Sequence, residues 1–387
     1  MPKIRITEVD NTFSVIQNSV SNVVYIPCAV TGDKGIDPKQ FNSVSELDSA
    51  EGYDTDRLSY KLARKLLGYG MYVLVEGVKE ATAGVCPTID WERLKSIQAY
   101  DIGFLTKGEY SETDTGMVGC AFARGNSVAL CDHPATTITG ATGSVAGAVR
   151  DYFETNVDSG KGAFSAAFTP GWITKNPDLL VDDDTEERIP ASFGYLFAYA
   201  RAMQFNPEWY AVAGTTRGVI DGISGVEYEY SASDVEILQA RASTGEVDLD
   251  ASGDNVGQAI NPISWVRPFG YLVWGNRTML SNNGSTKATS FLNVRNLVNL
   301  VKKQMYNAAI KYTFEQNSDV LWINFKAYIT PLLDQMQSGN GILGYRFYKV
   351  KTNAKARLKA RLVIIPIEAV EDFDLTIELS DSLEIVE

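Results

Sequence analysis

Two stretches late in the chain alternate strictly between apolar and charged side chains. From Lys355 to Leu362 every odd-numbered residue is basic and every even-numbered residue is Ala or Leu. From Asp372 to Leu379 the apolar residues fall at odd positions, with acidic residues between them except at Thr376. A period of two predicts β-strands with one apolar and one charged face. Opposite charges on neighbouring strands contribute about 0.2–1 kcal/mol per pair, so the two strands are suited to one sheet.

A third alternating stretch lies at the start of the sequence. The basic residues Lys3 and Arg5 alternate with the apolar residues Ile4 and Ile6. This pattern predicts an exposed strand that has no partner in its own domain. A frayed chain end is the alternative interpretation.

Between these ends the sequence predicts helices and buried strands. Apolar residues recur at helical spacing from 291 to 312, and Lys302 and Lys303 lie mostly off that stripe. A second helix is predicted over much of 318–337, with a break or kink at Pro331. Further upstream, helical and strand patterns alternate, which is typical of an α/β layer. The fold class is therefore α+β or α/β.

The domain division follows from length and local composition. A chain of 387 residues is long enough for two domains. The polar stretch 243–258 is rich in Gly and Asp and is predicted to connect them. We therefore expect a segment 1–22, an α/β domain over 23–257, a second domain over 258–366 and a final segment 367–387.

Charge and cysteine content exclude several classes of function. The formal net charge of −13 argues against nucleic acid as the main partner. The four cysteines show no CxxC pairing, so we expect reduced thiols in a reducing compartment. The first residues lack the apolar run of a signal peptide, and no apolar run approaches the roughly 20 residues that span a membrane. A cytoplasmic protein without membrane insertion is predicted.

The familiar catalytic and cofactor motifs fail on context. Residues 339–344 match GxGxxG, but they follow a predicted helix and precede a strand, the reverse of a dinucleotide site. His133 is the sole histidine, so any His-containing triad must use it and no typical zinc site is available. We predict no catalytic residue, cofactor or metal. A carbohydrate- or peptide-acting enzyme that uses carboxylates stays open as the alternative.

A series of short motifs resembles the contractile tail sheath proteins. Residues 261–263 read Asn-Pro-Ile, 274–279 read Trp-Gly-Asn-Arg-Thr-Met, and 293–295 read Asn-Val-Arg. These are similar to the family's Asn-x-Ile, Trp-Gly-Ala-Arg-Thr-Leu and Val-Arg-Arg elements, with Asn replacing the Ala and the second Arg. Weaker likenesses at 165–172, 188–194 and 206–214 keep the family's order. The first 160 residues match only loosely.

The resemblance implies a structural protein of a virion tail, assembled in a bacterial host cytoplasm. It implies an outer α/β domain, an inner C-terminal domain and extended arms at both ends. Subunits would stack as rings, usually of six, around a tail tube. Contraction would then drive the tube through a cell envelope. The implied partners are other copies of the chain, the tail tube protein, and baseplate and tail terminator proteins.

The alternating strands match the linkage that such a lattice requires, because unpaired edges join by β-augmentation. The predicted arm contacts are Lys3, Ile4, Arg5, Ile6, Phe373, Leu375, Ile377 and Leu379. The predicted receiving sheet combines 345–350 with 355–364, and its contact residues are Lys355, Arg357, Leu358, Lys359 and Arg361. The helix 291–312 is expected to face the tube through Lys302 and Lys303.

Overall fold

A computed structural model of the chain gives the arrangement of most of the sequence. It describes residues 23–81, 85, 87–110, 114–134, 145–157, 159–181, 184–239, 259–280, 288–351 and 357–369. The predicted arm residues 3–6 and 373–379, and Lys355, lie outside these ranges.

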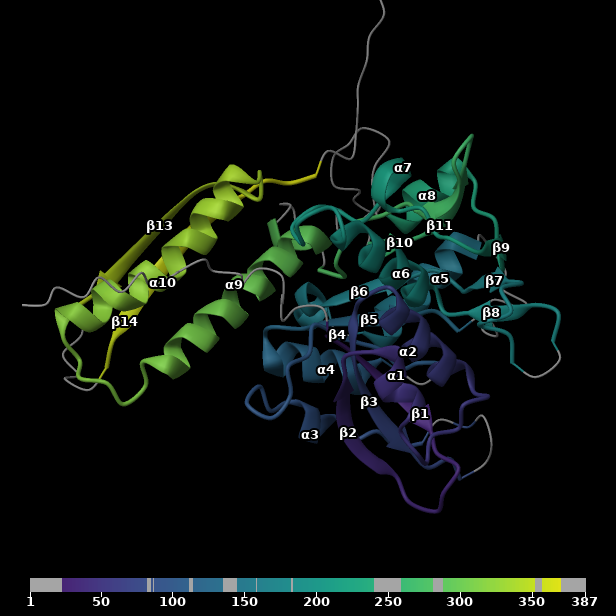
Figure 1. The fold of residues 1–387 in the computed structure, drawn as a ribbon. Coiled ribbons are helices and arrows are strands. Elements are labelled where there is room, and N and C mark those ends of the chain that lie inside the picture. Colours follow the sequence, from purple (N-terminus) through teal and green to yellow (C-terminus); the bar gives the residue numbers. More distant parts are fainter. Residues whose placement is uncertain are drawn as a thin grey trace, which may run out of the picture.

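A seven-stranded sheet forms the centre of the larger body (Figure 1). Neighbouring strands pair in parallel, apart from one antiparallel strand at the edge. The strands across the sheet are β10 (Ile260–Asn261), β6 (Ser165–Phe168), β5 (Val128–Asp132), β4 (Phe104–Leu105), β1 (Val23–Ala29), β3 (Tyr72–Val78) and the antiparallel β2 (Ile36–Phe41). Both faces must be covered, because parallel strands are joined by helical crossovers.

Alternate side chains of the strands point to opposite faces of the sheet and pack into two separate cores. Val24 and Ile26 of β1 belong to one apolar cluster, whereas Val23 and Tyr25 belong to the other. The helices packed on the first face are α1 (Val44–Asp48), α2 (Leu58–Gly68) and α6 (Ala191–Met203). Those on the second face are α3 (Trp91–Leu94), α4 (Thr115–Arg124), α5 (Val145–Asn156) and α8 (Ala232–Leu238). The result is a three-layer α/β arrangement, in agreement with the α/β fold class that the sequence predicts.

Two small sheets and short helical turns complete the larger body. A three-stranded sheet runs in the order β8 (Glu187–Ile189), β7 (Trp172–Thr174) and β9 (Ile223–Val226). A hairpin pairs β11 (Ile263–Val266) with β12 (Gly270–Val273). The turns are α7 (Gly214–Arg217), η4 (Ser159–Phe164) and η5 (Ala288–Ser290).

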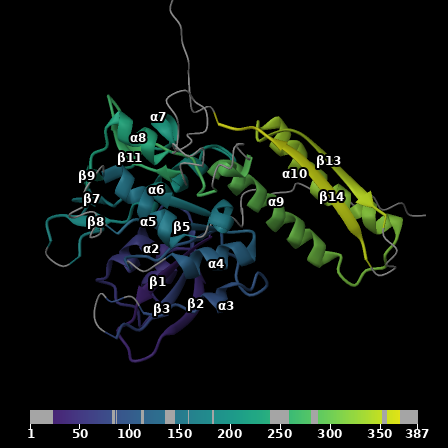
Figure 2. The same ribbon diagram turned by 180° about the vertical axis from the view of Figure 1, so that it is seen from behind.

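The second body is a helical hairpin that packs on a β-hairpin. Its helices are α9 (Leu292–Lys311) and α10 (Asp319–Ser338), and its strands are β13 (Ile342–Val350) and β14 (Lys359–Pro366). Figures 1 and 2 show α10, β13 and β14 set apart from the larger body, with α9 leading out to them. The predicted helices and strands are present, but α10 continues through Pro331 instead of breaking there, and β14 begins at Lys359.

The expected domain boundary at residue 258 is corrected by this arrangement. Residues Ile260 and Asn261 pair with β6 at the edge of the main sheet, and β12 packs with α6. The start of α9 contributes Leu292 to the larger core. Leu297, Leu300 and Val301 of the same helix belong to the core of the smaller body. The chain therefore passes from one body to the other inside α9.

Candidate assembly surfaces

The β13–β14 sheet presents one face to the helices and the other to solvent. Ala360, Leu362 and Ile364 of β14 are half-buried and pack against the core of the smaller body. The intervening residues Lys359, Arg361, Val363 and Ile365 are exposed. Leu343 on β13 is also exposed, with 66% of its surface accessible. The outer surface of this sheet therefore combines basic and large apolar side chains.

This sheet contains two strands among the residues that the structure describes. Its antiparallel register runs from Ile342 opposite Pro366 to Val350 opposite Lys359. Each strand pairs on one side, so in the described part of the chain the other side carries unpaired backbone groups. Such edges template pairing with a further strand. Arg357 and Leu358 precede β14 directly, and Leu358 packs on the core of the smaller body.

A second exposed apolar surface lies at the turn between α9 and α10. Phe314 is fully exposed and has a left-handed backbone, with φ of 73°. Ile310 at the end of α9, and Val320 and Ile323 at the start of α10, are each more than half exposed. We name these four residues the hairpin tip. A left-handed backbone is costly for a bulky residue, so the position of Phe314 is held by the turn rather than by its own preference.

Lys303 occupies a different place from the one expected. It is 3% exposed, and its Nζ lies 2.8 Å from Oδ1 of Asp101 in the larger body. Burial lowers the pKa of Lys303, and the nearby Asp101 carboxylate opposes that shift. A lysine that is buried and paired within its own subunit cannot face the tube, so that expectation is wrong for Lys303.

Lys302 also contacts the larger body. Its Nζ donates to the carbonyl oxygen of Gly125 at 2.7 Å and lies 5.3 Å from the centre of the Phe164 ring. Arg295, about two turns earlier on α9, covers the same ring at 4.3 Å. Arg295, Lys302 and Lys303 of α9 therefore join the two bodies of one subunit.

Trp209 holds the C-terminal end of α10 against the larger body. Its Nε1 donates to the carbonyl oxygen of Gly339 at 2.9 Å, directly after α10. A Cβ atom added to Gly339 or to Gly341 would come within 2.8 Å of the indole ring. Both glycines are therefore required by the close approach of Trp209. The GxGxxG pattern at 339–344 is thus a helix end and strand start, as the sequence predicts.

The motif residues of the family resemblance meet in one buried network. Asn261, on β10, donates to the carbonyl oxygens of Ala167 and Arg277 at 3.0 and 2.8 Å, and accepts from the Arg277 amide at 2.8 Å. Asn276 donates to Oδ1 of Asn293 at 2.8 Å, at the start of α9. Asn293 in turn donates to the carbonyl oxygen of Trp209 at 3.0 Å. These motifs therefore fix the path from the main sheet into α9.

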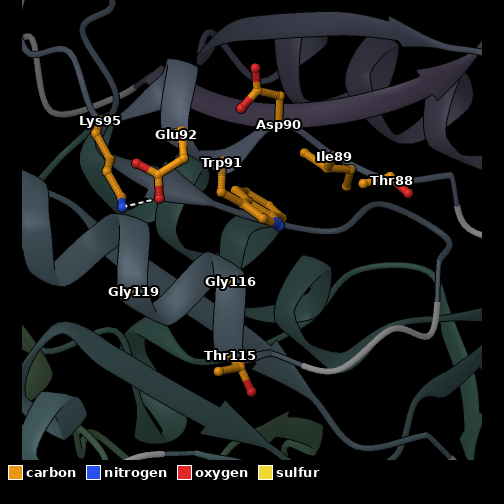
Figure 3. A pocket seen from close by; sticks show the side chains of 9 residues that line it. All are labelled: Thr88, Ile89, Asp90, Trp91, Glu92, Lys95, Thr115, Gly116 and Gly119. Atoms are coloured by element: carbon orange, nitrogen blue, oxygen red, sulfur yellow. Dashed lines mark hydrogen bonds and ion pairs between the residues drawn. The ribbon is translucent and has the colours of Figure 1, made fainter.

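An open cleft of about 470 Å³ lies between α3 and α4 (Figure 3). The indole ring of Trp91 lies against Gly116, where an added Cβ would approach to 2.5 Å. Asp90 accepts from the Arg93 amide, and Glu92 forms an ion pair with Lys95. The acidic groups Asp90 and Glu92 at this cleft thus have structural partners within α3 and at its C-terminal cap.

Buried titratable groups gather at the carboxyl ends of β4 and β5. Lys107 and Asp114 form a buried ion pair at 2.7 Å. Burial raises the pKa of Asp132 to about 6, although Ser192 donates to it through both its amide and its hydroxyl group. Burial lowers the pKa of His133 to about 4. The adjoining cavity measures about 30 Å³, which is enough to hold water.

Within the described ranges, no three His, Cys, Asp or Glu side chains are placed to hold a metal ion. The helices in that part of the chain are too short or too polar to cross a membrane. Cys28, Cys120 and Cys131 are buried free thiols, as expected, and Cys86 lies outside the described residues.

Sequence reasoning missed the hairpin tip and the Trp209 contact. A run of apolar residues at 320–323 inside an amphipathic helix was a usable signal for the tip, because one helix face cannot bury all of them. Nothing local marks Trp209, because its partners lie about 130 residues further along the chain.

Comparison with known proteins supports the sequence resemblance. No family model matches the chain. Over 173 residues it is 26% identical to a tail sheath protein of Vibrio phage KVP40. That match covers 44% of this chain and 22% of the phage protein, so the chain spans about a fifth of the length of that relative.

Solved structures match along almost the whole chain. The sheath complex of an extracellular contractile injection system, PVC, in its contracted state gives a TM-score of 0.66 at 16% identity, covering 99% of this chain and 98% of that one. A chain of the anti-feeding prophage baseplate, sixfold symmetrised, also gives 0.66 at 16% identity, covering 98% and 99%. The chain therefore has the fold of the sheath proteins of contractile injection systems, the class that its sequence motifs resemble.

Proposed function

We propose that the chain is the structural subunit of a contractile sheath. Copies stack as rings around a tail tube, and contraction of the stack drives the tube through a target cell envelope. The observation that carries this proposal is the match of the whole chain to a sheath complex, 99% of one and 98% of the other. Rings of six are supported by the sixfold assembly of the anti-feeding prophage neighbour. The role is mechanical, so the subunit requires no catalytic residue or cofactor.

Electron microscopy of the purified protein tests this function. Long tubes of uniform diameter are expected in negative stain, because copies of a sheath subunit carry complementary edges that close into rings and stack. A protein that stays monomeric at high concentration and turns over a carbohydrate or peptide substrate contradicts the proposal.

The linkage between copies is proposed to use the β13–β14 sheet. Strands 3–6 and 373–379 of neighbouring copies would pair with its edges, with Arg357, Lys359 and Arg361 beside acidic arm residues. The support is the pair of unpartnered edges and the basic outer face within the described residues. Deleting residues 1–10 should leave a folded subunit that forms no tubes. Normal tubes from the deletion variant refute the linkage.

We propose that the hairpin tip, and not the basic face of α9, contacts the tube. The support is that the tip exposes four large apolar side chains, whereas Lys302 and Lys303 are engaged within the subunit. Baseplate and terminator proteins would bind the ends of the same stack, which places the protein in the tail particle.

A paired substitution tests the proposed tube contact. Changing Val320 and Ile323 to Ser should abolish co-assembly with the tube but leave sheath self-assembly intact, because both side chains are exposed. Asn324→Ser, on the same helix, is the matched control. Co-assembly at the level of the control shows that the tip is the wrong surface.

A further inference from the structure

The segment that follows β14 in the sequence begins close to the free edge of that strand. β14 pairs with β13 on one side, and no other strand is placed beside it in the described part of the chain. The amide of Ile367 donates to the carbonyl oxygen of Gly341 at 3.1 Å, which extends the pairing one residue past the strand. The predicted strand 372–379 begins after only four more residues, 368–371. Loops of four residues commonly join antiparallel strands.

The inner face of the sheet is also incompletely covered. Ala360, Leu362 and Ile364 pack against α9 and α10 but are only half-buried. A further strand at this edge would extend the apolar face and remove more of that surface from water, at about 25 cal/mol per Å². The apolar residues of 372–379 fall at odd positions, so all of them can share that inner face.

We propose that residues 372–379 pair antiparallel with β14 of their own chain, so that the unassembled subunit is closed. A four-residue loop at 368–371 sets one register. It places Leu362 opposite Ile377 and Ile364 opposite Leu375 on the inner face. On the outer face it places Arg361 opposite Glu378.

The charge distribution favours this occupant. Residues 370–387 contain seven acidic side chains and no basic one. Residues 292–369 contain twelve basic and four acidic side chains, in a chain whose net charge is −13. The acidic strand therefore meets the most basic part of its own chain. Opposed charges also disfavour other registers, although the apolar set determines the face.

The short connection at 368–371 favours pairing of β14 with the strand of its own chain over the strand of a second copy. A short flexible linker gives an effective concentration on the order of millimolar. Free subunits at micromolar concentration therefore close on themselves, since a second copy is about a thousandfold more dilute. The consequence for assembly rests on the proposed sheath function, and the pairing itself does not. Exchange into a neighbour becomes favourable only where subunits are already held side by side.

Cysteine cross-linking in the full chain tests the closed subunit. Directly opposed residues on antiparallel strands have Cα atoms about 4.5–5.5 Å apart, which a disulfide can span. The test variant is Arg361→Cys with Glu378→Cys. The matched control is Arg361→Cys with Ile377→Cys, which places the second thiol on the opposite face. Both carry Cys86→Ser, because the other three native cysteines are buried.

Dilute protein is oxidised and analysed by non-reducing electrophoresis and peptide mass spectrometry. We expect an intramolecular disulfide in the test variant, forming roughly tenfold faster than in the control because only that pair is in reach. Disulfide-linked dimers in place of cross-linked monomers would overturn the proposal, since they show exchange with a second copy. Equal rates in the two variants, or no cross-link in either, would also overturn it.

Microscopy then separates this inference from the proposed function. The oxidised test variant should form no tubes, and reduction should restore them. Tubes that form equally well from the locked subunit refute closure as a control of assembly while supporting the sheath function. A protein that forms no tubes in any state, yet gives the intramolecular cross-link, refutes the sheath function and leaves the pairing in place.

Discussion

Replacement of Asn261 by Ala tests the buried network that the motif residues form. Asn261 is fully buried and makes three side-chain hydrogen bonds to backbone groups, at 2.8 to 3.0 Å. Each such bond contributes about 0.5–1.5 kcal/mol net, and more where a buried backbone group loses its partner. The three bonds share two neighbouring segments, so their losses are not independent. We expect the free energy of unfolding to fall by about 3 kcal/mol.

Urea unfolding followed by tryptophan fluorescence measures this loss, because Trp209 and Trp274 lie beside the network. The matched control is Asn324→Ala, which makes the same chemical change at an exposed position on α10. It should change the free energy of unfolding by less than about 0.5 kcal/mol. A loss at Asn261 below about 1 kcal/mol, the ordinary effect of a point substitution, refutes the reasoning.

Three other perturbations follow from named contacts. Gly341→Val should destabilise the smaller body, because the valine side chain would overlap the Trp209 indole ring. The rate of amide hydrogen exchange in α10 should therefore rise, whereas the rate in the main sheet should not. Burial raises the pKa of Glu208 from 4.5 to about 7. Its contribution to stability is therefore present below about pH 4.5 and lost as the pH rises through about 7. The free energy of unfolding of Glu208→Gln, measured with urea, should therefore fall less than that of the wild type between these two pH values. Phe314→Gly should raise the free energy of unfolding by about 0.5–1 kcal/mol, because glycine accepts the left-handed backbone, and an unchanged or lower value would contradict this.

Local patterns predicted the elements whose signals are local. The alternation over 355–362 predicted a strand, and β14 begins later, at Lys359. The helical spacing over 291–312 predicted α9 almost to the residue. The motif at 274–279 was recognised by resemblance, and its physical reason appeared only in the structure. Asn276 and Asn293 are needed because they join a loop to the first turn of α9.

Lys303 was misplaced because its environment is set by a distant residue. A lysine is rarely buried unless it is paired. Its partner Asp101 precedes it by about 200 residues, so no window of sequence contains both. The surrounding spacing therefore suggested a solvated position, and only the tertiary arrangement reverses that expectation.

The predicted domain boundary at residue 258 is wrong for a different reason, which is that α9 belongs to both bodies. A boundary is expected where few contacts cross, and the polar stretch 243–258 has that composition. The chain instead returns to the main sheet at β10 and leaves it along a continuous helix. One end of α9 serves the larger core through Leu292, and the other serves the smaller core through Val301 and Ala308. A helix shared in this way transmits displacement between the two bodies as a rigid element. Any rotation of the smaller body must therefore be absorbed by side-chain contacts beside α9, among them the ion pair between the buried Lys303 and Asp101.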